Sequence, residues 1–122
     1  TGARGEQIAA SHLKRQGYLI LERNFRTPLG EIDIIAFRDG VVAFVEVRTV
    51  TGPARFDPRY TVNRTKQQRL VRAARQYASR HNLERENILI RFDLITVDIP
   101  EDGGEREVKH YPDAFDRESA GN

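Results

Sequence analysis

The sequence predicts a mixed α/β protein, with a small sheet flanked by helices in the order α, β, β, β, α, β. Three observations lead to this class: two segments with helical spacing of apolar residues, runs rich in β-branched residues between and after them, and a tight-turn dipeptide between two of these runs. A chain of 122 residues has the length of one domain. We therefore expect a single domain over residues 1–115, followed by a polar tail at 116–122.

Each element in the first part has its own signal. Over residues 4–16, Ile8 and Leu13 belong to an apolar stripe at helical spacing, and the following glycine favours a helix end. Residues 18–25 alternate loosely between apolar and polar and predict a first strand. A turn containing Pro and Gly follows it.

The middle of the chain predicts a hairpin and a loop. Residues 31–37 and 42–49 are rich in Ile, Val and Phe, and Asp39-Gly40 between them is a strong hairpin signal. Residues 50–60 contain glycine and two prolines, which interrupt both regular patterns. We expect two antiparallel strands followed by a loop.

The last part predicts a longer helix and two more strands. Over residues 63–81 apolar side chains recur at i, i+3, i+4, i+7 and i+8, which is typical of an amphipathic helix. Residues 88–99 form a further strand, ended by Pro100, and residues 107–111 form a short edge strand.

Charge is unevenly distributed, although the formal net charge is only +2. Residues 1–81 contain 15 Lys and Arg against 7 Asp and Glu, whereas residues 82–122 contain 5 against 11. Arginine supplies 17 of the 20 cations, and its guanidinium matches phosphate oxygens bidentately. The basic part indicates an anionic partner such as nucleic acid, or neutralisation by the acidic part.

Two absences limit the class of function. The chain has no cysteine, which excludes disulfides, thiolate catalysis and cysteine-bound metals. Its uncharged apolar runs are only a few residues long, so we expect no membrane span and no membrane partner. A cytoplasmic protein fits these features.

The hairpin turn predicts which side chains face each other. If Asp39-Gly40 forms the turn, Asp33 lies opposite Glu46. Glu31 then lies opposite Arg48, and alternation directs all four side chains to one face. The other face is wholly apolar and is expected in the core: Ile32, Ile34, Ala43, Val45 and Val47.

Two facing carboxylates predict a divalent-cation site. Opposed Cβ atoms on neighbouring strands are about 4.5–5.5 Å apart, so Asp33 and Glu46 repel unless a proton or a cation lies between them. Carboxylate oxygens suit Mg²⁺ or Mn²⁺. The alternative is an ordinary ion pair between Glu31 and Arg48, with the other two carboxylates facing solvent at a sheet edge.

Each predicted helix adds one charged candidate on its buried stripe. These are Glu6 in the first helix and Lys66 in the second. The alternatives are that Glu6 is a first-turn acid favoured by the helix dipole, and that Lys66 extends its ammonium group to solvent.

Six motifs resemble the bacterial YraN family and span nearly the whole chain. They are Gly5-Glu6, Gly30-Glu31-Ile32-Asp33-Ile34-Ile35-Ala36, Phe44-Val45-Glu46-Val47-Arg48-Thr49, Lys66-Gln67, Arg91-Phe92-Asp93 and Asp113-Ala114-Phe115. This family is similar to archaeal Holliday junction resolvases and the restriction-endonuclease-like superfamily. The resemblance implies a restriction-endonuclease-like core, metal-dependent endonuclease activity on structured or branched DNA, and a homodimer.

The resemblance also implies the roles of individual residues. Asp33 would be the D, and Glu46-Val47-Arg48 the E-x-K, of the PD-(D/E)-x-K nuclease signature. The metal ligands that it implies for Mg²⁺ or Mn²⁺ are Asp33, Glu46, Glu6 and the Val47 carbonyl. Arg48 stands where the signature has lysine, so it keeps a cation near the phosphate but cannot lose a proton to act as a base. Lys66 is a second candidate cation for the site.

Arginines supply the expected contacts to nucleic acid. On the outer arc of the second helix these are Arg64, Arg72 and Arg75, and in loops they are Arg26 and Arg55. The alternative is that they are solvated surface charges. The three histidines, His12, His81 and His110, have no neighbours at metal-ligand spacing and are not assigned to the site.

Two other functions stay open beside the nuclease. Arg48 is compatible with a nucleic-acid-binding module on the same fold that has lost catalysis. The basic arc of the second helix is compatible with an adaptor that binds an acidic protein.

Overall fold

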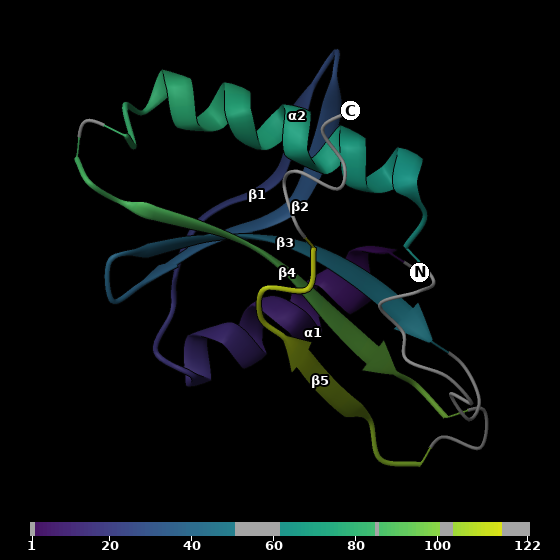
Figure 1. The fold of residues 1–122 in the computed structure, drawn as a ribbon. Helices are drawn as coiled ribbons and strands as arrows, with labels where there is room; N and C mark the ends of the chain where they lie inside the picture. The colour runs from purple at the N-terminus through teal and green to yellow at the C-terminus, as the bar shows by residue number, and fades with distance from the viewer. Residues whose placement is uncertain (1, 51–61, 85, 101–103, 116–122) are drawn as a thin grey trace.

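The computed structural model describes residues 2–50, 62–84, 86–100 and 104–115, and it has two helices packed on a five-stranded sheet (Figure 1). The helices are α1 (Gly2–Arg15) and α2 (Arg64–Arg80). The strands are β1 (Leu19–Thr27), β2 (Gly30–Arg38), β3 (Val41–Val50), β4 (Leu89–Asp98) and β5 (Glu107–Tyr111). The predicted mixed α/β class and order of elements are confirmed. Most of the expected loop at 50–60 and the tail at 116–122 lie outside the described residues.

The strands are ordered in the sheet as they are in the chain, β1-β2-β3-β4-β5. The first three form an antiparallel meander, β4 is parallel to β3, and β5 is antiparallel to β4. Because adjacent parallel strands need a connection that returns to the starting end of the sheet, α2 lies between β3 and β4 in the chain.

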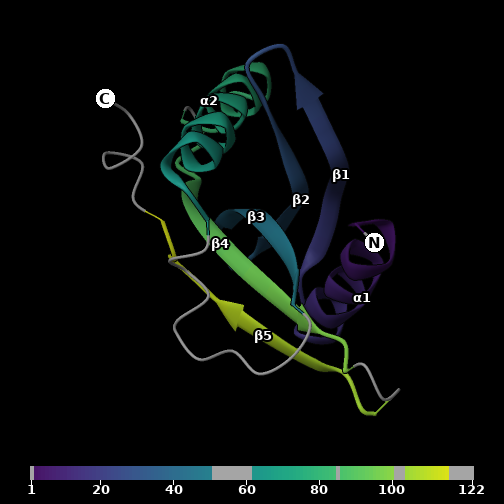
Figure 2. The same ribbon diagram turned by 90° about the vertical axis from the view of Figure 1, so that its right-hand side faces the viewer.

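The two helices cover opposite faces of the sheet (Figure 2). On one face Leu13 of α1 belongs to a buried cluster with Ile34. On the other face Leu70 of α2 belongs to a cluster with Phe44 and Phe92. Each such side chain stabilises the fold by about 1.5–3 kcal/mol through burial. Among the described residues, no helix is long and apolar enough to cross a membrane.

Two glycines allow the helices to approach the sheet closely. Gly30 at the start of β2 faces the backbone of Arg69 in α2, and an added Cβ would lie 2.6 Å from the Arg69 carbonyl carbon. In α1, a Cβ at Gly5 would collide with the hydroxyl of Thr49 in β3. The neighbouring residues Glu31 and Glu6 are therefore held next to α2 and β3, respectively.

The hairpin between β2 and β3 has the predicted turn and register. Asp39-Gly40 has φ angles of 51° and 78°, as a two-residue type I′ turn requires. Pairing runs from Arg38–Val41 to Ile34–Val45. Within this fully described hairpin, the pairing of the two strands does not extend to Asp33 and Glu46, which were predicted to lie opposite each other.

One part of the predicted apolar face is wrong, because the alternation of side chains reverses at Asp33. Ile34 belongs to the cluster under α1, whereas Ile32 belongs to the cluster under α2. β1 pairs with β2 at Arg23–Ile34 and at Phe25–Ile32, and Asn24, between these two pairs, has a positive φ of 54°. A left-handed residue interrupts the extended backbone. The two strands therefore change face together at this position.

Candidate functional site

A pocket of about 210 Å³ lies where β2 and β3 cease to pair. It is lined by Glu6, Glu31, Asp33, Glu46, Val47, Lys66 and Arg69. We call it the acid pocket. Its residues come from α1, the β2–β3 hairpin and α2, so the fold brings together three parts of the chain that are distant in sequence.

Asp33 is held in the acid pocket by the backbone of β3. Its Oδ2 accepts a hydrogen bond from the N–H of Val47 at 2.8 Å. This side-chain contact lies just beyond the last paired residues of the two strands. Burial raises the pKa of the Asp33 carboxyl, although the Val47 N–H acts against the rise.

Glu46 is the most strongly perturbed carboxyl in the acid pocket. Its side chain is only 12% exposed, and burial together with the neighbouring Asp33 raises its pKa to about 7. Lys66 Nζ lies 3.4 Å from Glu46 Oε2 and opposes this rise. Without a further cation, the pair holds a proton near neutral pH.

Glu6 reaches the acid pocket from α1, which covers the face of the sheet opposite α2. Because α1 begins at Gly2, Glu6 lies beyond the first turn, which contains no acid. The alternative of a first-turn acid is therefore wrong. Burial and the charge of Asp33 raise the pKa of Glu6. Its Oε1 is buried without a hydrogen-bond partner among the described residues, so the acid pocket contains an unsatisfied oxygen.

α2 supplies two cations to the acid pocket, and sequence reasoning identified only Lys66. Asn63 caps this helix by accepting a hydrogen bond from the Lys66 N–H at 2.9 Å, which fixes the backbone beneath the lysine. Arg69 was missed, although its i+3 spacing from Lys66 places it on a neighbouring part of the helix surface. Arg69 Nη2 lies 3.7 Å from Glu31 Oε1. Glu31 therefore has an ion-pair partner on α2, and the described pairing of β2 with β3 ends before the predicted position of Glu31 opposite Arg48.

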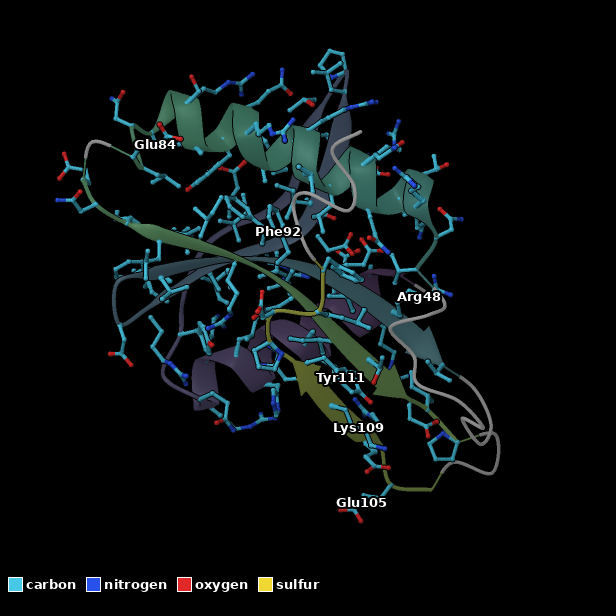
Figure 3. All side chains as sticks on the ribbon, in the orientation of Figure 1. Arg48, Glu84, Phe92, Glu105, Lys109 and Tyr111 are labelled. Carbon is cyan, nitrogen blue, oxygen red and sulfur yellow. The ribbon has the colours of Figure 1, made fainter. Side chains whose placement is uncertain are left out.

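Arg48 lies near the C-terminal end of β3 (Figure 3). It is two residues beyond Glu46, so alternation along the strand places both on the same face of β3. It is half-buried and adjacent to Thr96 of β4. It is not among the described residues that line the acid pocket. Lys66, in contrast, lines the acid pocket, and its Nζ lies 3.4 Å from Glu46 Oε2.

The arginines predicted to contact nucleic acid are exposed, wherever they belong to the described residues. Arg64, Arg72 and Arg75 are exposed on α2, as their positions on the helix predict. Arg26 was expected in a loop but lies within β1, which extends to Thr27; it is exposed, and its charge lowers the pKa of Glu6. Arg55 lies outside the described residues.

The donor set of the acid pocket fits a hard cation that keeps part of its hydration. No group of three or more His, Asp or Glu side chains in the described parts of the chain is arranged to hold a metal ion. Magnesium commonly binds through one or two carboxylates and retains several waters. Asp33 and Glu46 supply such a pair, and Glu6 and Val47 line the same pocket.

A second polar network lies on the α1 side of the sheet, and sequence reasoning missed it. Asp93 is fully buried and accepts two hydrogen bonds of 2.8 Å from Arg91 and one of 2.9 Å from the N–H of Asp113. His110 Nε2 lies 2.7 Å from Asp93 Oδ2. Arg91 also donates to the hydroxyl of Tyr18 at 2.7 Å. Although burial acts to raise the pKa of Asp93, the bonds from His110 and Arg91 lower it on balance.

This network explains two of the sequence motifs. Arg91-Phe92-Asp93 and Asp113-Ala114-Phe115 are neighbours in the fold, because the Ala114 N–H also donates to the Phe92 carbonyl at 2.8 Å. Phe115 is buried in the same cluster as Phe92. The available signal in the sequence was a single acid within the apolar run of β4. The network connects β5 and the following residues to β4.

The pKa of Glu46 predicts how stability depends on pH in the metal-free protein. Folding raises this pKa from 4.5 to about 7, so the folded state binds the proton more tightly than the unfolded state. The contribution of Glu46 to the free energy of unfolding should therefore fall as pH rises between these values. Urea denaturation in EDTA at pH 5, 6, 7 and 8 checks this.

Glu46→Gln is the matched variant for this pH experiment, because it keeps the shape of the side chain without the titration. We expect the difference in unfolding free energy, wild type minus variant, to decline from pH 5 to pH 7 and then level off. A difference that does not change with pH, or that rises, contradicts the prediction.

Comparison with known proteins places this chain among bacterial relatives of similar length. The sequence profile described as "Uncharacterised protein family UPF0102" matches residues 5–97. A UPF0102 protein of Syntrophotalea carbinolica is 45% identical over 115 residues, which cover 94% of this chain and 90% of the relative. A UPF0102 protein of Clostridium perfringens is 40% identical over 114 residues, which cover 93% and 92%. The chain therefore belongs to the UPF0102 family, which is the YraN family indicated by its motifs.

Proposed function

We propose that this protein is a metal-dependent endonuclease with a restriction-endonuclease-like core, acting on structured or branched DNA. One observation carries the proposal: two partly buried carboxyls, Asp33 and Glu46, line one pocket and raise each other's need for a proton or a cation, and the ammonium group of Lys66 lies 3.4 Å from Glu46. This combination of acids and a cation is suited to binding a divalent metal and a phosphodiester together.

Asp33 and Glu46 are the proposed ligands of Mg²⁺ or Mn²⁺. The Val47 carbonyl and Glu6, whose Oε1 has no partner in the described residues, are the proposed additional oxygen donors. They would act through water retained by the cation, because the three described acids do not form a group arranged for direct coordination. When bound, a divalent cation supplies positive charge that stabilises the phosphodiester as negative charge builds on its oxygens. The Val47 N–H keeps Asp33 oriented toward the pocket.

Lys66 is the proposed catalytic cation. Its compact ammonium group has three donors and lies 3.4 Å from Glu46, so it can donate to a phosphate oxygen and orient a water molecule for attack. Arg48 is proposed to contact the phosphate from further along β3, where its permanent charge attracts the substrate but accepts no proton. This division of roles supports activity in a chain that has arginine at the signature position.

The charge around the acid pocket supports a polyanionic substrate. Arg69 on α2 lines the acid pocket, Arg26 on β1 lies close enough to lower the pKa of Glu6, and both arginines are exposed. Contacts of this kind position a nucleic-acid backbone without reading its sequence. A homodimer, which the family resemblance also implies, would present two such pockets to the two strands of a branched substrate.

A cleavage assay tests the proposal. We expect the wild-type protein to cleave branched or flapped DNA in Mg²⁺ or Mn²⁺ but not in EDTA, with linear duplex as the comparison substrate. Asp33→Asn should abolish cleavage by removing a charged oxygen ligand. Glu105→Gln removes an equal charge near the start of β5 and should retain full cleavage (Figure 3). Equal cleavage by wild type and Asp33→Asn would contradict the assignment.

The position of Arg48 outside the acid pocket favours one alternative function, a nucleic-acid-binding module without catalysis. That alternative predicts salt-dependent DNA binding by the wild-type protein with no cleavage in either metal. An adaptor for acidic proteins is the remaining alternative, and it predicts no DNA binding even at low salt.

A further inference from the structure

α2 carries a row of cations that begins at the acid pocket. Lys66, Arg69, Arg72 and Arg75 follow one another at every third position, and all four are exposed. Because each step of three residues turns by about 60° on a helix with 3.6 residues per turn, the row crosses the outer surface of α2 obliquely and its two ends lie about half a turn apart. Lys66 and Arg69 line the acid pocket, whereas Arg75 lines a different pocket, between α2 and β4. We call this row the basic ridge.

The electrostatics of α2 are unfavourable for an isolated helix. Its 17 residues contain six Lys and Arg but no Asp or Glu. Like charges three or four residues apart repel each other, and cations in the first turn oppose the helix dipole. Arg64 and Lys66 both lie in that first turn. A polyanion bound along the helix would convert this repulsion into attraction.

We infer that the basic ridge is the track along which the sugar-phosphate backbone of a bound nucleic-acid strand leaves the acid pocket. This inference rests on the proposed function and names the path of its substrate. From Lys66 to Arg75 the helix rises by roughly 13 Å at 1.5 Å per residue. Because the row also turns halfway around the helix, its path over the surface is longer than this rise and spans at least about four nucleotides at 3.4 Å each. Lys66 lies at the reacting phosphate, and Arg69, Arg72 and Arg75 contact phosphates successively further away.

Arg69 is poised to exchange its present partner for a phosphate. Its ion pair with Glu31 is long, at 3.7 Å, and the two side chains are 45% and 53% exposed. Pairs of this kind contribute little to stability, so their exchange costs little. The contact of Gly30 with the Arg69 backbone fixes the point from which the side chain extends. Arg69 therefore connects the acid pocket to the outer part of the ridge.

Binding measured in EDTA tests the ridge separately from cleavage. Fluorescence anisotropy with a labelled duplex at several salt concentrations gives the slope of log affinity against log salt. Arg69→Ala, Arg72→Ala and Arg75→Ala should each reduce the magnitude of this slope by roughly 0.9. Lys14→Ala, an equal loss of charge on α1 across the sheet, should leave it unchanged. Equal effects of the ridge variants and the α1 variant would overturn the ridge.

Uncharged phosphates test the order of contacts. Duplexes that carry a single methylphosphonate at successive positions should each lose affinity for the wild-type protein. In each variant, the methylphosphonate at the phosphate that the missing arginine contacts should cause no further loss of affinity, because a removed contact cannot be lost twice. We call this the silent position of the variant. The silent positions of Arg69→Ala, Arg72→Ala and Arg75→Ala should follow one another in this order along the strand. Silent positions without this order would overturn the track.

The failure of the track and the failure of the proposed nuclease are distinguishable. Ordered silent positions in a protein that cleaves no DNA would support the track and contradict the nuclease. Metal-dependent cleavage that Asp33→Asn abolishes, with no contribution from the ridge to binding, would support the nuclease and overturn the track.

Discussion

Lys66→Met is expected to reduce DNA cleavage by about 10²–10³-fold, the loss typical of removing one donor to the transition state. The reason is its position: Lys66 lines the acid pocket beside Glu46, whereas Arg48 does not line it. Arg48→Lys should therefore change cleavage by less than about tenfold, an effect below 1.4 kcal/mol. Single-turnover rates at saturating protein check both variants.

Two further variants make the interpretation of Lys66 specific. Lys66→Arg should retain part of the activity, because it keeps the charge but replaces a compact donor with a planar fork. Lys14→Met, an equal loss of charge on α1, should retain all of it. A large gain in Arg48→Lys, combined with no loss in Lys66→Met, would instead assign the catalytic cation to β3. If every variant is inactive and titration detects no metal at the carboxyl pair, Asp33 and Glu46 form only a polar end of the sheet.

Asp93→Ala is expected to destabilise the fold by about 3–5 kcal/mol, the cost of removing one partner from a buried ion pair. It leaves Arg91, His110 and the N–H of Asp113 without their shared acceptor. The melting temperature should fall by roughly 10–20 °C for a domain of this size. Urea denaturation and circular dichroism check both values.

Asp98→Ala is the matched control, because Asp98 lies half-buried at the end of the same strand. It should cost about 0.5 kcal/mol or less. A loss below about 1 kcal/mol in Asp93→Ala would contradict a structural role for the network.

The lowered pKa of Asp93 predicts the sign of its pH dependence. The contribution of Asp93 to the free energy of unfolding is fully present above 3.8, the pKa of this group in the unfolded chain. It is lost as pH falls through the lower pKa that Asp93 has in the folded protein. The stability advantage of wild type over Asp93→Asn should therefore shrink in acid.

The order of elements and the hairpin register were predictable from the sequence because local patterns determine them. The spacing of apolar residues identified both helices, and the Asp39-Gly40 turn fixed the pairing of β2 with β3. The same periodicity selected Glu6 and Lys66, since each belongs to a helix face that approaches the sheet. These inferences needed only the periods of helices and strands.

Only the tertiary structure decided two things: which way side chains face where the strand alternation is interrupted, and which side chains of distant segments contact each other. The left-handed Asn24 is a local feature, but its effect appears across the strand pair, where it moves Ile32 to the other face. The contact between Arg69 and Glu31 depends on how closely α2 packs on β2. The acceptor role of Asp93 depends on β5 and the following turn, which lie far along the chain. Local sequence determines the period and register of each element, whereas side-chain contacts between distant elements depend on packing distances that no local pattern encodes.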